Sequence, residues 1–175
     1  MANEEKASVE FRVERAEANL DRIIAWVWRH NYRTAFLFGA VTLMYGYNFE
    51  VIRDFTGDCW ALKYWALFLF GIITALYGII VYLLFLSIKP DVNPKKDSYV
   101  FFGTISQMEQ SSFVKEVRDL DCERYLEDVL CQVHRNAEIV TKKFSLLSRA
   151  FYYFAVFIGF WFLFIGLATV PEFLC

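Results

Sequence analysis

Few side chains in this sequence of 175 residues could carry out chemistry. There are two histidines, His30 and His134, and neither has a Ser, Cys or carboxylate at a spacing typical of a catalytic motif. The sequence has no P-loop and no glycine-rich dinucleotide fingerprint. Cys122 and Cys131 are nine positions apart, so on one helix they would face different directions, and they lack the spacing of a metal site. We therefore expect neither an enzyme nor a bound metal or cofactor.

The composition is that of a membrane protein. Hydrophobic residues make up 57% of the chain and charged residues 22%, which is too apolar for a soluble protein of this size. Residues 64–88 and 150–170 contain no charged residue, and each exceeds the roughly 20 residues that cross a hydrocarbon core. Residues 34–52 form a third span if Glu50 lies at the interface. We predict an all-α membrane protein with three transmembrane helices and a small helical cytoplasmic subdomain.

Two helices of the predicted cytoplasmic subdomain should continue into membrane spans. Residues 1–33 have the three- and four-residue apolar spacing of an amphipathic helix, and no proline or glycine separates them from the first span. After the second span, Pro90 and Pro94 interrupt helix formation. Residues 116–149 then carry two apolar rows at seven-residue spacing, Leu126, Val133, Val140 and Leu147 in one and Leu130, Ala137, Phe144 and Phe151 in the other. Such heptad rows could pack within one chain or between copies.

Basic residues predict the orientation in the membrane. There are six in residues 1–33, two in the loop 53–63, ten in the linker and stalk 89–149, and none in the tail 171–175. By the positive-inside rule, the N-terminus and the 89–149 segment are cytoplasmic, whereas the 53–63 loop and the C-terminus are periplasmic. The first 30 residues carry many charges and no apolar region of signal type, so we expect no signal peptide.

Some residues leave alternatives open. Cys59 and Cys175 would both lie on the oxidising side, where they could form a disulfide or simply be small residues at the interface. Glycine pairs seven residues apart occur in the first two spans, at Gly39 and Gly46 and at Gly71 and Gly78. They could allow close approach of another helix, as in an oligomer, or give local relief to bulky neighbours. The spans contain no ionisable residue between 64 and 88 or between 150 and 170, which disfavours a selective carrier.

Motifs outside the spans follow one another in a recognisable order. A Phe-Phe-Gly-aliphatic stretch comes first, a Tyr-Leu-x-Asp helix with Gln and Asn follows, and two lysines precede the last span. The residues are Phe101, Phe102, Gly103 and Ile105, then Tyr125, Leu126, Asp128, Gln132 and Asn136, then Lys142 and Lys143. Together with the helix and the two spans before it, this order resembles the transmembrane effector family of the Pycsar anti-phage system, over nearly the whole chain from about Val13.

The resemblance implies a multi-pass effector of the bacterial inner membrane. Such an effector would sense a cyclic pyrimidine mononucleotide, cCMP or cUMP, made by a partner cyclase, and would impair membrane integrity so that growth stops before phage are released. Its partners would be the lipid bilayer, the cyclic nucleotide and further copies of itself, but no nucleic acid polymer. The alternative is an effector or scaffold subunit of another defence system, controlled by a protein partner or a cyclic oligonucleotide.

A cyclic mononucleotide would need cations for its phosphate, an aromatic surface for its base, and amides or hydroxyls for specificity. The cytoplasmic elements offer Arg22, Trp26, Arg29, Ser98, Tyr99, Gln132, Asn136 and Lys143. The Phe101-Phe102-Gly103 turn is expected to dock against the stalk as a lid, with Gly103 in a backbone conformation closed to other residues. The turn could instead be a plain hydrophobic plug on the helix pair, and the cations near the spans could instead meet anionic lipid headgroups.

Overall fold

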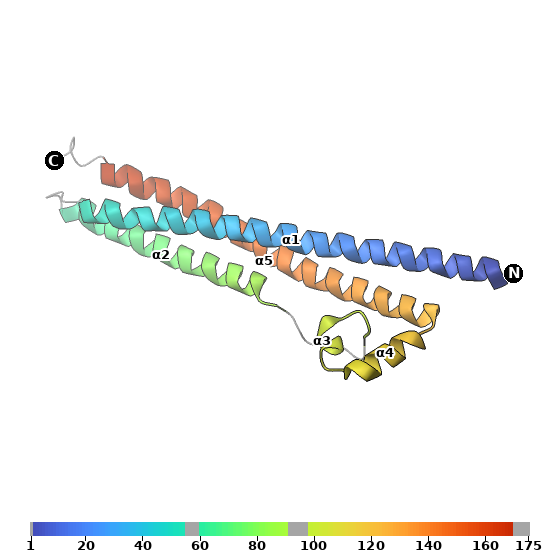
Figure 1. The fold of residues 1–175 in the computed structure, drawn as a ribbon. Helices are drawn as coiled ribbons and strands as arrows, with labels where there is room; N and C mark the ends of the chain where they lie inside the picture. The colour runs from blue at the N-terminus through green and yellow to red at the C-terminus, as the bar shows by residue number, and fades with distance from the viewer. Residues whose placement is uncertain (1, 55–59, 91–97, 170–175) are drawn as a thin grey trace. The chain divides into compact units, whose positions relative to one another are not determined.

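The computed structural model describes residues 2–54, 60–90 and 98–169, and all the regular elements among them are helices. These are α1 (Ala2–Asp54), α2 (Trp60–Ile88), α3 (Phe102–Ile105), α4 (Gln110–Arg118) and α5 (Cys122–Thr169) (Figure 1). Three helices, α1, α2 and α5, are long and apolar enough to cross a membrane. The predicted all-α membrane fold is confirmed, including the two long helices that contain the first and last spans.

The chain divides into two compact units. The first comprises residues 1–29 and 90–142, and the second comprises residues 30–89 and 143–175. Because α1 and α5 each extend past these divisions, both helices contribute residues to both units. The seven segment boundaries predicted from hydropathy and charge stay predictions, as does the orientation of the termini. The predicted Cys59–Cys175 pair lies outside the described residues.

The second unit is built from α2 and from parts of α1 and α5 (Figure 1). These helices pack around one hydrophobic cluster. Along each helix its buried residues are separated by three, four or seven positions, the spacing of coiled-coil packing. They are Leu37 and Val41 on α1, Ala66, Ile73, Ile80 and Leu84 on α2, and Leu147, Ala150, Phe157 and Phe164 on α5. A Cβ added at any of the four glycines singled out above would meet nothing within 4 Å, so packing inside one protomer does not require them.

The first unit contains a smaller core. Ala16 of α1 and Leu126 and Val129 of α5 are buried together, with Val13, Leu20, Val100, Tyr125 and Val133 packed against them. The amphipathic start of α1 therefore buries its apolar stripe against α5 and against the residues that precede α3. This packing holds the segment from Ser98 to Phe101 beside α5.

The packing register of α5 differs from the predicted heptad. Leu126 and Leu147 of the first predicted row are buried, but Leu130 and Phe151 of the second row are exposed. Val129 and Ala150 are buried instead, so the second row begins one residue earlier. Since Val129 and Leu130 are both apolar and lie three and four residues after Leu126, the sequence pattern fits either register. Packing against Ala16 selects Val129.

Candidate functional site

A short segment before α3 is fastened to α5 by polar side chains. The backbone N–H of Tyr99 donates to Asp128 Oδ2 at 2.7 Å, and Gln132 Nε2 donates to Ser98 Oγ at 3.0 Å. Asp128 and Gln132 are one helical turn apart, so both face the segment from the same side of α5. Ser98 is buried, and its Oγ also accepts from the N–H groups of Val100 and Phe101. We call residues 98–101 the strap.

The turn after the strap differs from the expected lid. Phe101 is half-buried and Arg135 of α5 lies over its ring, 5.7 Å from the centroid. Phe102, by contrast, is 68% exposed, so it does not dock on the stalk as predicted. Gly103 does not adopt a left-handed backbone; its role is steric, because a Cβ there would lie 2.6 Å from Phe101 Cε1. The glycine leaves room for the ring of Phe101, and the guanidinium of Arg135 lies over this ring.

Tyr99 links the strap to two helices. Its N–H bonds Asp128 of α5, and its hydroxyl donates to Glu116 Oε2 of α4 at 3.0 Å. The guanidinium of Arg124 lies 6.0 Å from the centroid of its ring. A change in the position of Tyr99 must therefore disturb contacts with both α4 and α5.

Tyr99 and one face of α5 enclose a groove of about 990 Å³ in the first unit. Small-molecule sites typically measure roughly 300–1,000 Å³, so the groove is large enough for a nucleotide. Its lining residues are Tyr99, Glu123, Arg124, Leu126, Glu127, Asp128, Leu130, Cys131, Gln132, His134, Arg135 and Glu138. The groove combines an aromatic ring, two arginines, an amide and several carboxylates.

Two arginines, Arg124 and Arg135, line the groove. Arg124 adjoins the ring of Tyr99, and Arg135 adjoins the ring of Phe101. A guanidinium held on an aromatic face can form paired hydrogen bonds to phosphate, and the ring beside it offers a surface for a planar base. Four carboxylates also line the groove, so an anion would have to contact the arginines directly; these carboxylates belong to Glu123, Glu127, Asp128 and Glu138.

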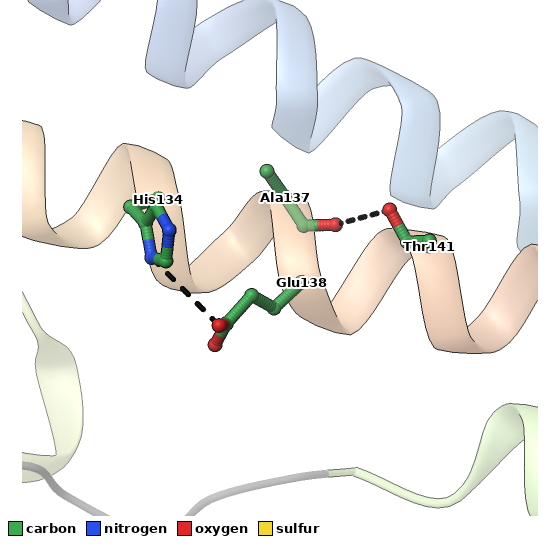
Figure 2. A network of polar contacts seen from close by, with 4 residues as sticks. All are labelled: His134, Ala137, Glu138 and Thr141. Carbon is green, nitrogen blue, oxygen red and sulfur yellow. Dashed lines mark hydrogen bonds and ion pairs between the residues drawn. The ribbon is translucent and has the colours of Figure 1, made fainter.

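One edge of the groove carries an interaction within α5. Figure 2 shows His134 and Glu138 one turn apart, with His134 Nδ1 3.9 Å from Glu138 Oε1. The same view shows Thr141 donating to the carbonyl of Ala137 at 2.9 Å. Both side chains of the His134–Glu138 pair are mostly exposed, so the pair can rearrange at little cost when a ligand enters.

A tyrosine–carboxylate contact joins α1 and α5 in the first unit. The Tyr125 hydroxyl donates to Glu17 Oε1 at 2.8 Å. Burial, and next the hydrogen bond to Glu17, raise the pKa of Tyr125 to about 12. The phenol therefore remains protonated and a donor throughout the physiological pH range.

Comparison with known protein families matches residues 15–170 to the family described as the Pycsar effector protein domain. The match covers most of the chain, including the groove, α2, α5 and α1 from residue 15 onward. The chain belongs to this Pycsar effector family. Comparisons with curated proteins and with solved structures gave no significant match. Family membership makes it a membrane effector of the Pycsar anti-phage system, and the resemblance noted from its motifs is confirmed.

The groove of this Pycsar effector contains only some of the predicted ligand residues. Tyr99 and Gln132 line it, and Phe101 adjoins it through Arg135. The other candidates do not line it: Arg22, Trp26, Arg29, Phe102, Gly103, Asn136 and Lys143. Arg29 lies over the Trp26 ring at 5.0 Å, and Lys143 belongs to the second unit, where its Nζ reaches the carbonyl of Ile88 at 3.5 Å. The role of all these residues in binding a ligand stays a prediction.

Sequence reasoning missed the two arginines of the effector's groove. Arg124 and Arg135 lie four residues before Asp128 and three residues after Gln132, on the helix face that carries both. A search for basic residues at helical spacing from the motif residues Asp128 and Gln132 would have found them. Among the described residues, no group of three or more His, Cys, Asp or Glu side chains could hold a metal ion.

Proposed function

We propose that this effector senses a cyclic pyrimidine mononucleotide, cCMP or cUMP, in the groove on α5 and responds by impairing the inner membrane. The observation that carries the proposal is the pair of arginine–aromatic contacts, Arg124 with Tyr99 and Arg135 with Phe101, at a groove of nucleotide size. The groove would lie on the cytoplasmic side, where a cyclase releases its product. No step of this function requires catalysis by the effector itself.

Each part of the ligand has a chemically suitable partner in the groove. The cyclic phosphate carries one negative charge, which Arg124 or Arg135 can meet with two parallel hydrogen bonds. The pyrimidine can stack on the ring of Tyr99. Gln132 and Asp128 then provide donor and acceptor groups that can distinguish one base edge from another.

Ligand binding would compete with the bonds that hold the strap. Asp128 and Gln132 fasten the strap at rest, and both also line the groove. A ligand that draws either side chain away would loosen the segment before α3 and α4. A ligand shifts a conformational equilibrium only through its different affinity for the two states, and exchange of these bonds supplies such a difference.

Binding can be tested with the full-length protein in lipid nanodiscs by isothermal titration calorimetry with cCMP and cUMP, with cAMP as the purine comparison. Substitution of Arg124 or Arg135 by Ala should weaken binding roughly 10- to 100-fold, the effect of losing a hydrogen-bonded charge pair. The matched control is Arg118→Ala, because Arg118 is an exposed arginine of α4 that does not line the groove. Equal affinities for all three variants would place the ligand elsewhere.

The membrane response can be tested in cells with a depolarisation dye. We expect depolarisation when the effector is expressed with an active pyrimidine nucleotide cyclase, and none with a catalytically dead cyclase. Absence of depolarisation and of nucleotide binding would instead support control by a protein partner. Val114 and Val117, exposed on the amphipathic helix α4, would then be the first residues to test as its contact surface.

A further inference from the structure

The interior face of α1 in the second unit is polar at both ends and apolar between them. The buried residues along this face are His30, Thr34, Leu37, Val41 and Asn48. Their steps of four, three, four and seven residues place them on one side of the helix. The interior seam, as we call this face and the helices packed against it, therefore begins with two polar groups and ends with another.

Asn48 is the most unusual residue of the seam. Its side chain is 0% exposed, and neither Nδ2 nor Oδ1 has a hydrogen-bond partner among the described residues. Thr42 Oγ1 is likewise buried without a partner in this part of the chain. A buried amide without a hydrogen-bond partner is unfavourable, and Asn48 lies only two residues before Glu50, which we expect at the water-facing interface. Water that reached Asn48 from this interface would supply the missing hydrogen bonds.

The other end of the seam is a connected polar cluster. His30 Nε2 lies 2.7 Å from Ser87 Oγ, and Ser87 Oγ donates to the carbonyl of Lys143 at 3.3 Å. Thr34 Oγ1 donates to the carbonyl of His30 at 2.9 Å. This cluster brings α1, α2 and α5 together through groups that water could equally well satisfy.

Fully buried apolar side chains separate the two polar ends. Leu37 and Val41 of α1 pack in the same cluster as Ile80 of α2 and Phe157 of α5, and all four are at most 1% exposed. From Thr34 to Asn48 the helix rises about 21 Å at 1.5 Å per residue. A closely packed apolar segment of this kind leaves no room for water and thereby blocks ions.

We propose that the interior seam is the route by which water and small ions cross the membrane when the effector is active. Leu37 and Val41 form the hydrophobic gate that keeps the seam dry at rest, and Asn48 is hydrated when it opens. This inference rests on the proposed function, because it assigns a path to the membrane impairment. Beyond His30, residues 34–49 contain no Asp, Glu, Lys, Arg or His, so this part of the path should not select ions by charge.

A contact between copies is a weaker account of Asn48. Polar side chains within membranes often bond across helices of different protomers. Here the side chain is fully enclosed by its own protomer, so a second copy could reach it only after the seam had opened.

The test is a polar substitution in the gate, compared with the same substitution facing outward at nearly the same depth. Val41→Asn should depolarise cells without any cyclase, with a basal leak roughly tenfold above wild type. Leu43→Asn is the control, because Leu43 is 78% exposed and lies two residues away on the same helix. Asn48→Leu should reduce the cyclase-dependent leak roughly tenfold, since it removes the group that water would satisfy. Membrane-fraction immunoblots confirm that each variant is inserted.

The outcomes separate the seam from the proposed function. Wild type that depolarises with active cyclase, together with equal basal leaks for Val41→Asn and Leu43→Asn and a wild-type response for Asn48→Leu, would overturn the seam and leave the function standing. If Val41→Asn does not reach the membrane, Asn48→Leu decides alone. Wild type that never depolarises would overturn the proposed function and the seam with it.

Discussion

The hydrogen bond from the Tyr99 N–H to Asp128 should set much of the free energy that holds the strap on α5. At 2.7 Å to a carboxylate that is partly buried, it should contribute about 1.5–3 kcal/mol, the range for hydrogen bonds to charged groups. Asp128→Ala should therefore increase the open population of the strap by roughly 10- to 150-fold, since 1.4 kcal/mol corresponds to a factor of ten. The Asp128→Ala variant should still insert, because neither the hydrophobic cluster of the second unit nor its spans include this residue.

Hydrogen exchange followed by mass spectrometry measures that opening directly. Protection of the peptide containing residues 98–105 should fall by the same factor in Asp128→Ala, in nanodiscs and without ligand. Glu127→Ala removes the same charge from the adjacent position and is the matched control. If both variants exchange at the same rate, the 2.7 Å contact does not hold the strap, and the argument that a groove ligand acts by releasing it is wrong.

Three further predictions concern the contacts and the orientation. Folding stabilises the protonated form of Tyr125, because its pKa is about 12 in the folded protein and about 10 in the unfolded chain. The contribution of this residue to stability is therefore full below about pH 10 and is lost as the pH rises from 10 to 12. The melting temperature of wild type should therefore fall relative to Tyr125→Phe across that interval, and a constant difference would contradict the assignment. Gly103→Ala should lower stability by about 1–3 kcal/mol because its Cβ would displace the Phe101 ring, whereas Gly46→Ala, with open space around it, should not. An alkaline phosphatase fusion after residue 175 should be active and one at residue 95 inactive; the reverse result would invert the predicted orientation.

The helices could be predicted because the sequence patterns that indicate them extend over many residues. An uncharged run such as 64–88 has no stable alternative to a membrane helix, and no proline or glycine interrupts the chain between the amphipathic N-terminal part of α1 and its span. The register of α5 could not be predicted in the same way. Val129 and Leu130 are equally apolar, and only the position of Ala16 decides which of them is buried.

The site was harder to predict than the fold because it depends on contacts between side chains far apart in the sequence. Gln132 and Tyr99 were found as polar and aromatic groups near the motifs, but Arg124 and Arg135 become relevant only once the strap lies on α5. For Gly103 the expected backbone conformation was wrong. The glycine is needed for the space of a neighbouring ring, which depends on a rotamer, and not for a backbone conformation that sequence statistics describe.

Under the proposed function, the strap bonds limit how strongly a ligand could act on this effector. Shifting a two-state equilibrium from 1:99 to 99:1 requires a ligand that favours one state by about 5.5 kcal/mol. Two hydrogen bonds hold the strap on α5 in the closed state, one from the Tyr99 N–H to Asp128 and one from Gln132 to Ser98. Together they should stabilise this state by a few kcal/mol relative to the state with the strap released. A ligand that replaces both bonds with its own could supply most of the required difference. A ligand held only by the arginines, leaving both bonds in place, would bind without activating, and such a compound would be an inhibitor of the effector.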